Sequence, residues 1–246
     1  MKSVAIFLIT HDNAIETAYF LDRLFQVTKH DFTLYVYDRY TGNEDMKKML
    51  ITATNKTKGQ YKQVAVDNVS IGQIYNSMLS KMSEDYGVFI SINFLVNKDW
   101  LNDLIYYNTS IKNSGCSSVS SCFQNVSLTS ALFDDDTKTE PVTKTIWVND
   151  TLTLNEFVFF SKTAYEDNDI GLFKVANEIN GLELSEWSFR YLANGLFNYY
   201  IGQNSIVKYK IDNEILFPKV ADIGKKELIK MMNELASGNN QINGII

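Results

Sequence analysis

Polar residues that could bind a ligand follow the first two apolar runs of the sequence, at the point where each run ends. Thr10, His11 and Asp12 close the run KSVAIFLI, and Asp38 and Thr41 follow the run FTLYVY. An acidic residue in such a place can accept a hydrogen bond from a ribose hydroxyl or a base N–H. The ends of neighbouring parallel strands share one crevice, so these residue types indicate recognition of a nucleotide.

A third polar group interrupts the stretch YGVFISINFLVNKDWLNDLI. Its first five residues predict a buried strand, Ser91 and Asn93 break that strand, and a short connection leads to a helix that carries Trp100 and Leu101. A strand with a polar carboxyl end is where an open α/β sheet usually places its ligand. Residues 91–93 could therefore hold a metal and a phosphate, or they could form only a turn.

The helix predicted to begin at Ser70 presents its N-terminus at the same edge of the sheet, where a negative group is favoured. Gly72 lies in its first turn, although glycine costs about 1 kcal/mol in a helix. Gly72 could allow a ligand or another backbone to approach closely. Alternatively, glycine is simply tolerated near the start of the helix.

Several common site patterns are absent from the sequence. No GxGxxG motif follows the first apolar run and no GxxxxGK[ST] motif occurs, which argues against a dinucleotide-binding fold and a P-loop. Two histidines with no CxxC or HExxH pattern argue against the common zinc sites. What remains is a nucleotide-binding α/β fold that does not use a glycine-rich phosphate loop.

The elements that must position these residues alternate strand and helix over the first half of the chain. Short β-branched apolar runs predict strands, and apolar residues at helical spacing predict helices. This alternation predicts a parallel sheet with helices on both faces. The predicted strands are 2–10, 32–37, 62–66 and 86–90, and the predicted helices are 14–27, 44–54, one from residue 70 and one from residue 100.

The second half of the chain predicts a more mixed arrangement. We expect one domain over residues 1–246, with a nucleotide-binding half at 1–113, a second half at 114–211, and a C-terminal helix and tail at 212–246. The predicted strands are 117–123, 126–133, 145–148, 157–161, 198–201 and 206–211, and the predicted helices are 163–167, 184–194 and 225–235.

Composition restricts the classes of function. At 246 residues, with 45% hydrophobic and 21% charged residues, the chain can bury a substantial core. A net charge of −6 without a stripe of Lys or Arg disfavours binding of duplex nucleic acid. The run from Val4 to Ile9 is too short for a transmembrane segment or a signal-peptide core. We therefore expect a cytoplasmic protein whose Cys116 and Cys122 are free thiols.

In the order of its motifs, the sequence resembles glycosyltransferases of the GT-A fold, and among them the large family 2. The resemblance extends from Val4 to about Lys210. It implies a Rossmann-like α/β fold with a mostly parallel central sheet, helices on both faces, and a smaller mixed half that binds the acceptor. The matching stretches are VAIFLITHDN, FTLYVYDRYTGNED, SIGQIYNSML, YGVFISINFLVNKDWL, EFVFFSKTAYEDNDIGLF and ELSEWSFRYLANG.

The resemblance implies a nucleotide-diphosphate sugar as donor. Asp38 takes the place of the aspartate that contacts the base in the family, and Asp12 stands where the family has asparagine. Asn76 matches an asparagine on the helix that begins near Ser70. The residues implied to bind the nucleotide sugar are Thr10, His11, Asp12, Asp38, Thr41, Asn76, Ser91 and Asn93.

The metal position departs from the family pattern. Ser91 and Asn93 take the places of the two DxD aspartates that bind a metal in the family, whereas Mn²⁺ and Mg²⁺ prefer charged oxygen ligands. An implied Mn²⁺ or Mg²⁺ cofactor would depend on Asn93 as a weak ligand. Lys208 or Lys210 could neutralise a departing diphosphate instead, or be solvated strand residues. Residues 134–136, three aspartates in a loop, could imitate a metal cluster or be solvated.

The catalytic position is also altered. Glu183 takes the place of the glutamate in the family's Glu-Asp pair, Leu184 replaces the aspartate, and Glu186 matches a following acidic position. Inverting transfer needs a carboxylate that takes the proton of the acceptor hydroxyl, and the resemblance implies Glu186 or Glu183. Both could instead cap the first helical turn. Trp187 and Trp100 could stack on the acceptor, or belong to the core.

Three functions remain open at this point. The leading one is an inverting glycosyltransferase of the hexosyltransferase class with a weak or absent metal site. Its acceptor could be a glycan, a protein, a lipid head group or a modified nucleotide. The second is a non-catalytic binding or structural protein that keeps the fold and has lost the metal and base residues. The third, a nucleotidyltransferase, is disfavoured because the loop THDNAIET lacks the glycines and basic residues of that class.

Overall fold

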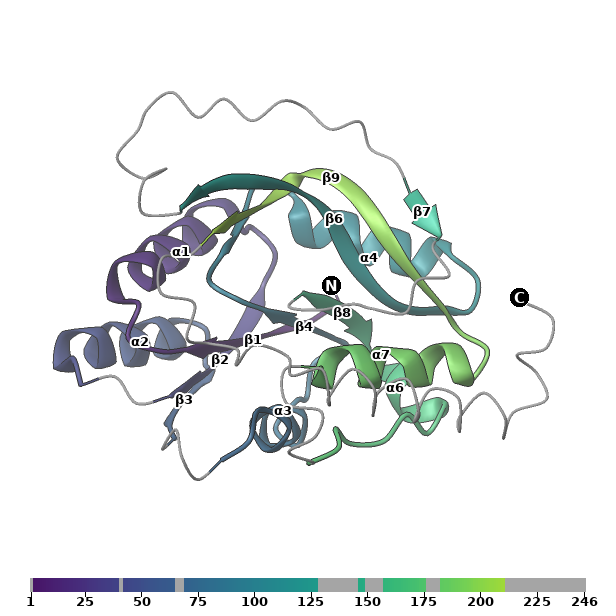
Figure 1. The fold of residues 1–246 in the computed structure, drawn as a ribbon, viewed down its shortest axis with the longest axis horizontal. Coiled ribbons are helices and arrows are strands. Elements are labelled where there is room, and N and C mark those ends of the chain that lie inside the picture. The colour runs from purple at the N-terminus through teal and green to yellow at the C-terminus, as the bar shows by residue number, and fades with distance from the viewer. Residues whose placement is uncertain are drawn as a thin grey trace.

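A sheet of nine strands runs through the described part of the chain, which is drawn as a computed structural model in Figure 1. Several predictions lie outside the described residues, among them the ligand residue Thr41, most of the strand at 126–133, the aspartates at 134–136 and the helix at 225–235. The structure describes residues 2–39, 42–64, 69–127, 146–148, 157–175 and 182–210.

Four parallel strands form one end of the sheet, in the spatial order β3-β2-β1-β4. They are β1 (Val4–Thr10), β2 (Phe32–Asp38), β3 (Gln60–Gln63) and β4 (Tyr86–Ile90). Thr10 of β1 is paired with Asp38 of β2, and Leu8 of β1 is paired with Ile90 of β4. Because the strands are parallel, this register brings Thr10, Asp38 and the residues after Ile90 to one edge of the sheet.

Helices cover both faces of these strands. Successive side chains of β1 point to opposite faces of the sheet, and each face forms its own hydrophobic core with the helices that cover it. One core contains Ile6 and residues of α1 (Ala14–Val27), α2 (Glu44–Lys56) and α4 (Trp100–Ser110). The other contains Phe7 and residues of α3 (Ile71–Leu79) and α7 (Glu183–Ala193), with α6 (Lys162–Asp167) packed against it. Figure 1 shows α3, α6 and α7 together on the lower side of the view. The predicted α/β fold with helices on both faces is confirmed.

Strands of both directions extend the sheet beyond β4. The additional strands are β8 (Val158–Ser161), β6 (Ser114–Ser127), β9 (Phe197–Lys210), β5 (Phe94–Val96) and β7 (Ile146–Val148). β8 is antiparallel to β4 and to β6, whereas β6 and β9 are parallel to each other. β5 and β7 both pair antiparallel with β9. One sheet therefore joins the parallel first half to a mixed second half.

Some strand boundaries differ from the prediction because pairing decided them. Residues 197–210 form one strand, not two, because β9 pairs with β6 along its length through register shifts that absorb the polar GQNS stretch. Residues 114–127 likewise form one strand in place of the break predicted before residue 126. Residues 94–96 were predicted as a connection, yet they pair with β9. β3 begins two residues earlier than predicted, in register with β2.

Candidate functional site

The first part of the candidate site is a hydrogen-bonded group at the ends of β1 and β2, which Tyr61 of β3 joins from the neighbouring strand. The Thr10 hydroxyl donates to Oδ1 of Asp38 over 3.2 Å, and the Tyr61 hydroxyl of β3 donates to Oδ2 over 3.1 Å. The Asp38 side chain is fully buried. Burial, reinforced by the charge of Asp38, raises the pKa of Tyr61 to about 12. Asp38 therefore links β1, β2 and β3, and any contact with a base is made by a carboxylate that two hydroxyls already orient.

His11 and Asp12 lie beside this group, before α1 begins. The His11 Nδ1 donates to the carbonyl oxygen of Arg39 over 2.6 Å, and the Arg39 N–H donates to the carbonyl oxygen of Thr10 over 2.8 Å. Asp12 has a positive φ of 26° and an exposed side chain. Of these strand-end residues, Asp12 presents the most accessible carboxylate at this edge.

Ser91 and Asn93 form a buried turn after β4. Their side chains are 6% and 4% exposed, and the Ser91 hydroxyl donates a short hydrogen bond to the Asn93 amide oxygen. The turn is closed by a bond from the Phe94 N–H to the Ser91 carbonyl. Asn93, the expected weak metal ligand, therefore offers an uncharged oxygen that already accepts a hydrogen bond.

These donors do not fit a divalent cation. Mn²⁺ and Mg²⁺ sites are built mainly from charged oxygen ligands, and the turn supplies one hydroxyl and one amide. Within the residues that the structure describes, no three His, Cys, Asp or Glu side chains gather as a metal site would require. Phe94 is paired with Lys208 across β5 and β9, so the Lys208 backbone lies next to this turn. The side chains of Lys208 and Lys210 lie outside the described part.

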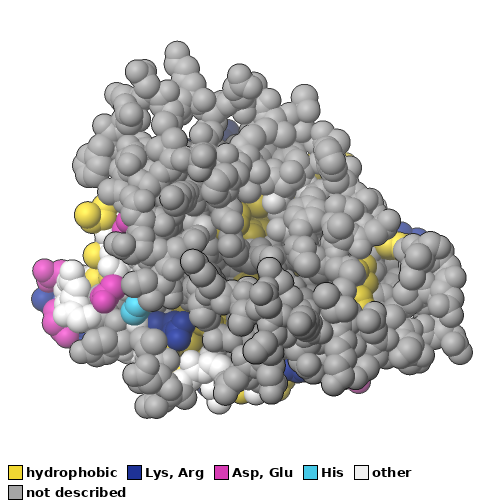
Figure 2. Space-filling view, in the orientation of Figure 1, with side chains coloured by type: hydrophobic (Ala, Val, Ile, Leu, Met, Phe, Trp, Pro, Cys, Tyr) yellow, Lys and Arg dark blue, Asp and Glu magenta, His cyan; other side chains and the backbone are white. Residues whose placement is uncertain are grey.

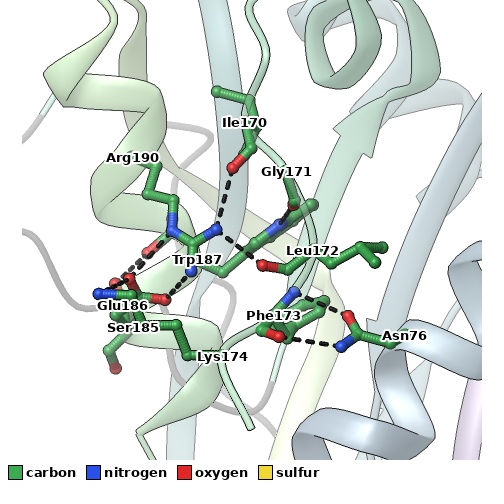
Figure 3. Close-up of polar contacts among 11 residues, drawn as sticks. Asn76, Ile170, Gly171, Leu172, Phe173, Lys174, Ser185, Glu186, Trp187 and Arg190 are labelled. Atoms are coloured by element: carbon green, nitrogen blue, oxygen red, sulfur yellow. Dashed lines mark hydrogen bonds and ion pairs between the residues drawn. The ribbon is translucent and has the colours of Figure 1, made fainter.

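The second part of the candidate site is the 170–174 segment, which we define as Ile170, Gly171, Leu172, Phe173 and Lys174. It is bonded to α3 and α7 (Figure 3). The Asn76 amide donates to the Phe173 carbonyl over 2.9 Å and accepts from the Phe173 N–H over 2.7 Å. Both polar ends of the Asn76 side chain are thus used within the protein. The Asn76 amide, which was expected to contact the nucleotide, here serves as a scaffold for the segment.

Glu186 is paired with Arg190 one turn along α7. The two carboxylate oxygens accept from Nε and Nη2 of Arg190 over 2.9 and 2.6 Å, and Nζ of Lys174 lies 3.7 Å from Oε1. The Glu186 side chain is only 1% exposed. Both oxygens proposed to take a proton from the acceptor therefore face the cationic groups of the protein itself.

Glu183 lies at the first position of α7, close to the start of α3. It is 4% exposed. A Cβ added to Gly72 would lie 2.6 Å from the Lys174 carbonyl oxygen and 3.8 Å from Cγ of Glu183. Gly72 is therefore explained by the close approach of another backbone, which was one of the expected reasons. The contact also brings the first turns of α3 and α7 together around Lys174.

Both tryptophans proposed for the acceptor are core residues, each with no exposed surface. Trp187 stacks on Phe173 with ring centroids 4.8 Å apart, and its Nε1 donates to the Gly171 carbonyl over 3.0 Å. Trp100 donates from Nε1 to the Thr28 hydroxyl over 2.9 Å, which fixes α4 against the end of α1. Both rings are packed in the core, which was the alternative to the expected contact with the acceptor.

Three residues shape the site but were given no role from the sequence: Arg190, Tyr61 and Lys174. The i, i+4 spacing of Glu186 and Arg190 on a predicted helix was a usable signal for their ion pair. Tyr61 lay one residue outside the predicted third strand, and Lys174 lay in a predicted loop, so nothing local marked either residue. Their roles depend on which segments the fold brings together.

The described part of the chain gives three further observations. On the face in Figure 2, acidic side chains gather at one edge beside a histidine, and the visible basic atoms form small separate patches. Among the helices that the structure describes, none has the length and apolar character needed to cross a membrane. Cys116 is a free, buried cysteine as expected, whereas the Cys122 side chain lies outside the described part.

Comparison with known proteins finds a likeness in structure alone. No protein-family model and no curated protein sequence matched the chain. The solved structure of S. aureus TarS residues 1–349 with UDP has a TM-score of 0.68 at 15% identity, over 98% of this chain and 67% of that one. A second structure of the same TarS fragment matches over 98% of this chain and 66% of that one, so the chain spans about two thirds of its length.

Two further solved structures agree with this result. Mannosyltransferase PcManGT from Pyrobaculum calidifontis, in complex with GDP-Man and Mn²⁺, has a TM-score of 0.61 at 12% identity, over 99% of this chain and 75% of that one. GalNAc-T7 with UDP, GalNAc and Mn²⁺ has a TM-score of 0.67 at 10% identity, over 96% of this chain and 50% of that one. The chain therefore has the GT-A fold of nucleotide-sugar transferases.

Proposed function

We propose that the chain is an inverting glycosyltransferase of the hexosyltransferase class, which moves a sugar from a nucleotide-diphosphate donor to an acceptor hydroxyl. The observation that carries the proposal is the extent of the structural likeness. Structures that hold UDP, GDP-Man or UDP with GalNAc match 96–99% of this chain, so the likeness includes both the parallel half and the mixed half. The proposal applies to the strand-end edge where Thr10, Asp38 and the Ser91 turn meet.

The donor lies along this edge in the proposed complex. Its base is held near Thr10, His11 and Asp12, where Asp12 is the exposed carboxylate, and near the buried Asp38. Thr41 is kept as a proposed contact of the same nucleoside. The diphosphate lies near the Ser91–Asn93 turn.

We further propose that donor binding depends little on Mn²⁺ or Mg²⁺. The turn that follows β4 supplies uncharged oxygens that bind each other, and such donors fit a divalent cation poorly. The Lys208 backbone, paired next to the turn, makes its ammonium group the proposed partner of the leaving diphosphate.

In the proposed chemical step, the sugar passes from the donor diphosphate to the acceptor hydroxyl. An acceptor oxygen forms a bond to the anomeric carbon while the bond from that carbon to the diphosphate oxygen breaks. The nucleoside diphosphate leaves with the electron pair, and the acceptor proton passes to a carboxylate. Of the two carboxylates proposed as the base, we assign the role to Glu183, which stands at the first position of α7 close to the first turn of α3, and the variants below test this choice.

Isothermal titration with UDP-, GDP- and dTDP-sugars, each with Mn²⁺ and with EDTA, tests the proposal. We expect one nucleotide class to bind in both conditions with similar affinity. If none of the three binds in either condition, the donor site and the proposed function are refuted.

A pair of variants then separates the two carboxylates. Glu183→Gln should lower turnover of the bound donor by roughly 10²- to 10⁴-fold, because it removes the base. Donor affinity should persist and the acidic limb of the pH–rate profile should disappear. If the acidic limb disappears in Glu186→Gln and not in Glu183→Gln, the assignment is reversed.

A non-catalytic nucleotide-binding protein is the second candidate, and one observation favours it. The Asn93 amide oxygen, the Asn76 amide and the Glu186 carboxylate all have hydrogen-bond partners within the chain. This candidate predicts nucleotide affinity without release of nucleoside diphosphate from any donor. Hydrolysis or transfer of a bound donor above the buffer rate would exclude it.

A further inference from the structure

Four consecutive backbone carbonyls of the 170–174 segment accept hydrogen bonds from side chains of two helices (Figure 3). Arg190 Nη1 donates to the carbonyls of Ile170 and Leu172 over 3.0 and 2.7 Å. Trp187 Nε1 donates to Gly171 over 3.0 Å, and Asn76 donates to Phe173 over 2.9 Å. An irregular segment cannot pair its own backbone groups, so these side chains take the place of secondary structure.

Arg190 is the central residue of this arrangement. Its Nε and Nη2 bond both oxygens of Glu186, while its Nη1 bonds two carbonyls, so one guanidinium joins α7 to the segment in two directions. The rigid planar fork of arginine suits such a role. Glu186 orients that fork, and its burial keeps water from competing for the ion pair.

The backbone of the segment is held in a shape that depends on these bonds. Gly171 has a φ of 75°, a region that other residues adopt only with strain. Ile170 and Phe173 are buried, whereas Leu172 is 55% exposed. The bonds to Arg190 therefore hold a backbone conformation in which Ile170 and Phe173 are buried and Leu172 and Lys174 are exposed.

We propose that Glu186 and Arg190 are a positioning pair that holds the 170–174 segment in this conformation, and that Glu186 acts through Arg190 and not on the acceptor. The segment then forms a fixed wall beside the proposed base Glu183, so loosening it lowers turnover more than donor affinity. The catalytic part of this inference rests on the proposed function. The structural part, in which Glu186 and Arg190 hold the 170–174 segment in place, is independent of the proposed function.

Amide hydrogen exchange of Phe173 tests directly whether the 170–174 segment is held in place. The Phe173 N–H belongs to the segment, and it donates to the side chain of Asn76 on α3. Arg190→Lys keeps the charge but cannot bond both Glu186 oxygens and two carbonyls at once. It should speed exchange at Phe173 by about tenfold or more. Arg23→Lys is the matched control, since Arg23 holds another segment through the Val96 carbonyl and the Asn97 amide. It should leave Phe173 unchanged and speed exchange around residues 94–97.

The same variants are assayed with the donor that the wild-type chain binds. Arg190→Lys should lower kcat for donor turnover about tenfold or more while the donor Kd stays within about twofold. Unchanged exchange at Phe173 would overturn the proposed hold, and faster exchange with unchanged kcat would overturn the positioning role. Failure of the wild-type chain to bind any nucleotide sugar would refute the proposed function instead, and the exchange comparison alone would decide the hold.

Discussion

Asn76 and Phe173 exchange two hydrogen bonds although 97 residues separate them in the chain. The side-chain amide of Asn76 pairs with the backbone of Phe173 as a neighbouring strand would. Asn76→Asp removes the donor and places a carboxylate oxygen against the Phe173 carbonyl. We expect the free energy of unfolding to fall by about 1–3 kcal/mol, because a partly buried hydrogen bond is replaced by repulsion. Urea denaturation measures the change.

The control for this variant is Asn102→Asp, the same chemical change at an exposed position in the first turn of α4. An acid is favoured in that turn, so the change should stay within about 0.5 kcal/mol of zero. Equal stability of the two variants would show that the bonds between Asn76 and Phe173 contribute nothing to folding.

Gly72 is explained by a backbone contact, and this makes an unusual prediction for a helical glycine. Replacing glycine by alanine inside a helix normally stabilises by up to about 1 kcal/mol. At Gly72 the new Cβ would lie 2.6 Å from the Lys174 carbonyl oxygen, so the segment or the helix must move. We expect Gly72→Ala to destabilise the fold by about 1–3 kcal/mol, as overpacking does.

Gly42→Ala, just before α2, is the control, because a Cβ at Gly42 meets no atom of the described residues within 4 Å. Thermal unfolding of both variants gives the comparison. A Gly72→Ala protein that is as stable as wild type, with an unchanged exchange rate at the Phe173 amide, would mean that Lys174 does not lie against α3 in solution.

The sequence could predict much of the fold because local pattern and tertiary structure agree there. The helix over 14–27 has the predicted limits, and β4 occupies 86–90 as predicted. Prediction was wrong where pairing outweighs local pattern. The three residues of β5 are too few to show alternation, and β9 continues through a polar stretch because β6 lies beside it along its length.

The candidate site was predictable in position but not in detail. Topology alone places the ends of parallel strands together, which accounts for Thr10 beside Asp38. The sequence could not show that Ser91 would bond Asn93 or that Asn76 would bond Phe173, since a side chain's partner depends on segments far away in the chain. Residue type predicted the chemistry available, and tertiary packing decided which groups remain for a ligand.

Tyr61 links the stability of the strand-end group to pH. Burial and the charge of Asp38 raise its pKa from 10.0 to about 12 in the folded chain. Between pH 10 and 12 the unfolded chain therefore loses this proton before the folded chain does. Stability falls as pH rises through this window. In Tyr61→Phe the fall should be shallower, by up to one proton in the slope of unfolding free energy against pH.

Urea midpoints across pH 9–12 would give these slopes. Tyr106→Phe is the control, because it removes the same hydroxyl from a tyrosine that is 64% exposed. At neutral pH, Tyr61→Phe should also cost about 1.5–3 kcal/mol, since it removes a hydrogen bond to the buried Asp38 carboxylate. Identical slopes for wild type and Tyr61→Phe would contradict the assigned interaction.

The turn after β4 offers a test of metal dependence by gain of function. Asn93→Asp has nearly the shape of the wild-type side chain, and the Ser91 hydroxyl can still donate to one of its oxygens. The second oxygen then provides a charged ligand where the wild type has none. We expect wild-type donor affinity to be equal in Mn²⁺ and EDTA, and Asn93→Asp to bind donor about tenfold more tightly with Mn²⁺ than without it.

Asn93→Ala completes the comparison, because it removes the amide oxygen and adds no charge. It should bind donor with the same affinity in Mn²⁺ and in EDTA. The prediction fails if wild-type affinity already rises with Mn²⁺ and that rise is lost in Asn93→Ala. In that case the Asn93 oxygen is itself a metal ligand, and the uncharged turn binds the cation together with the donor's phosphates.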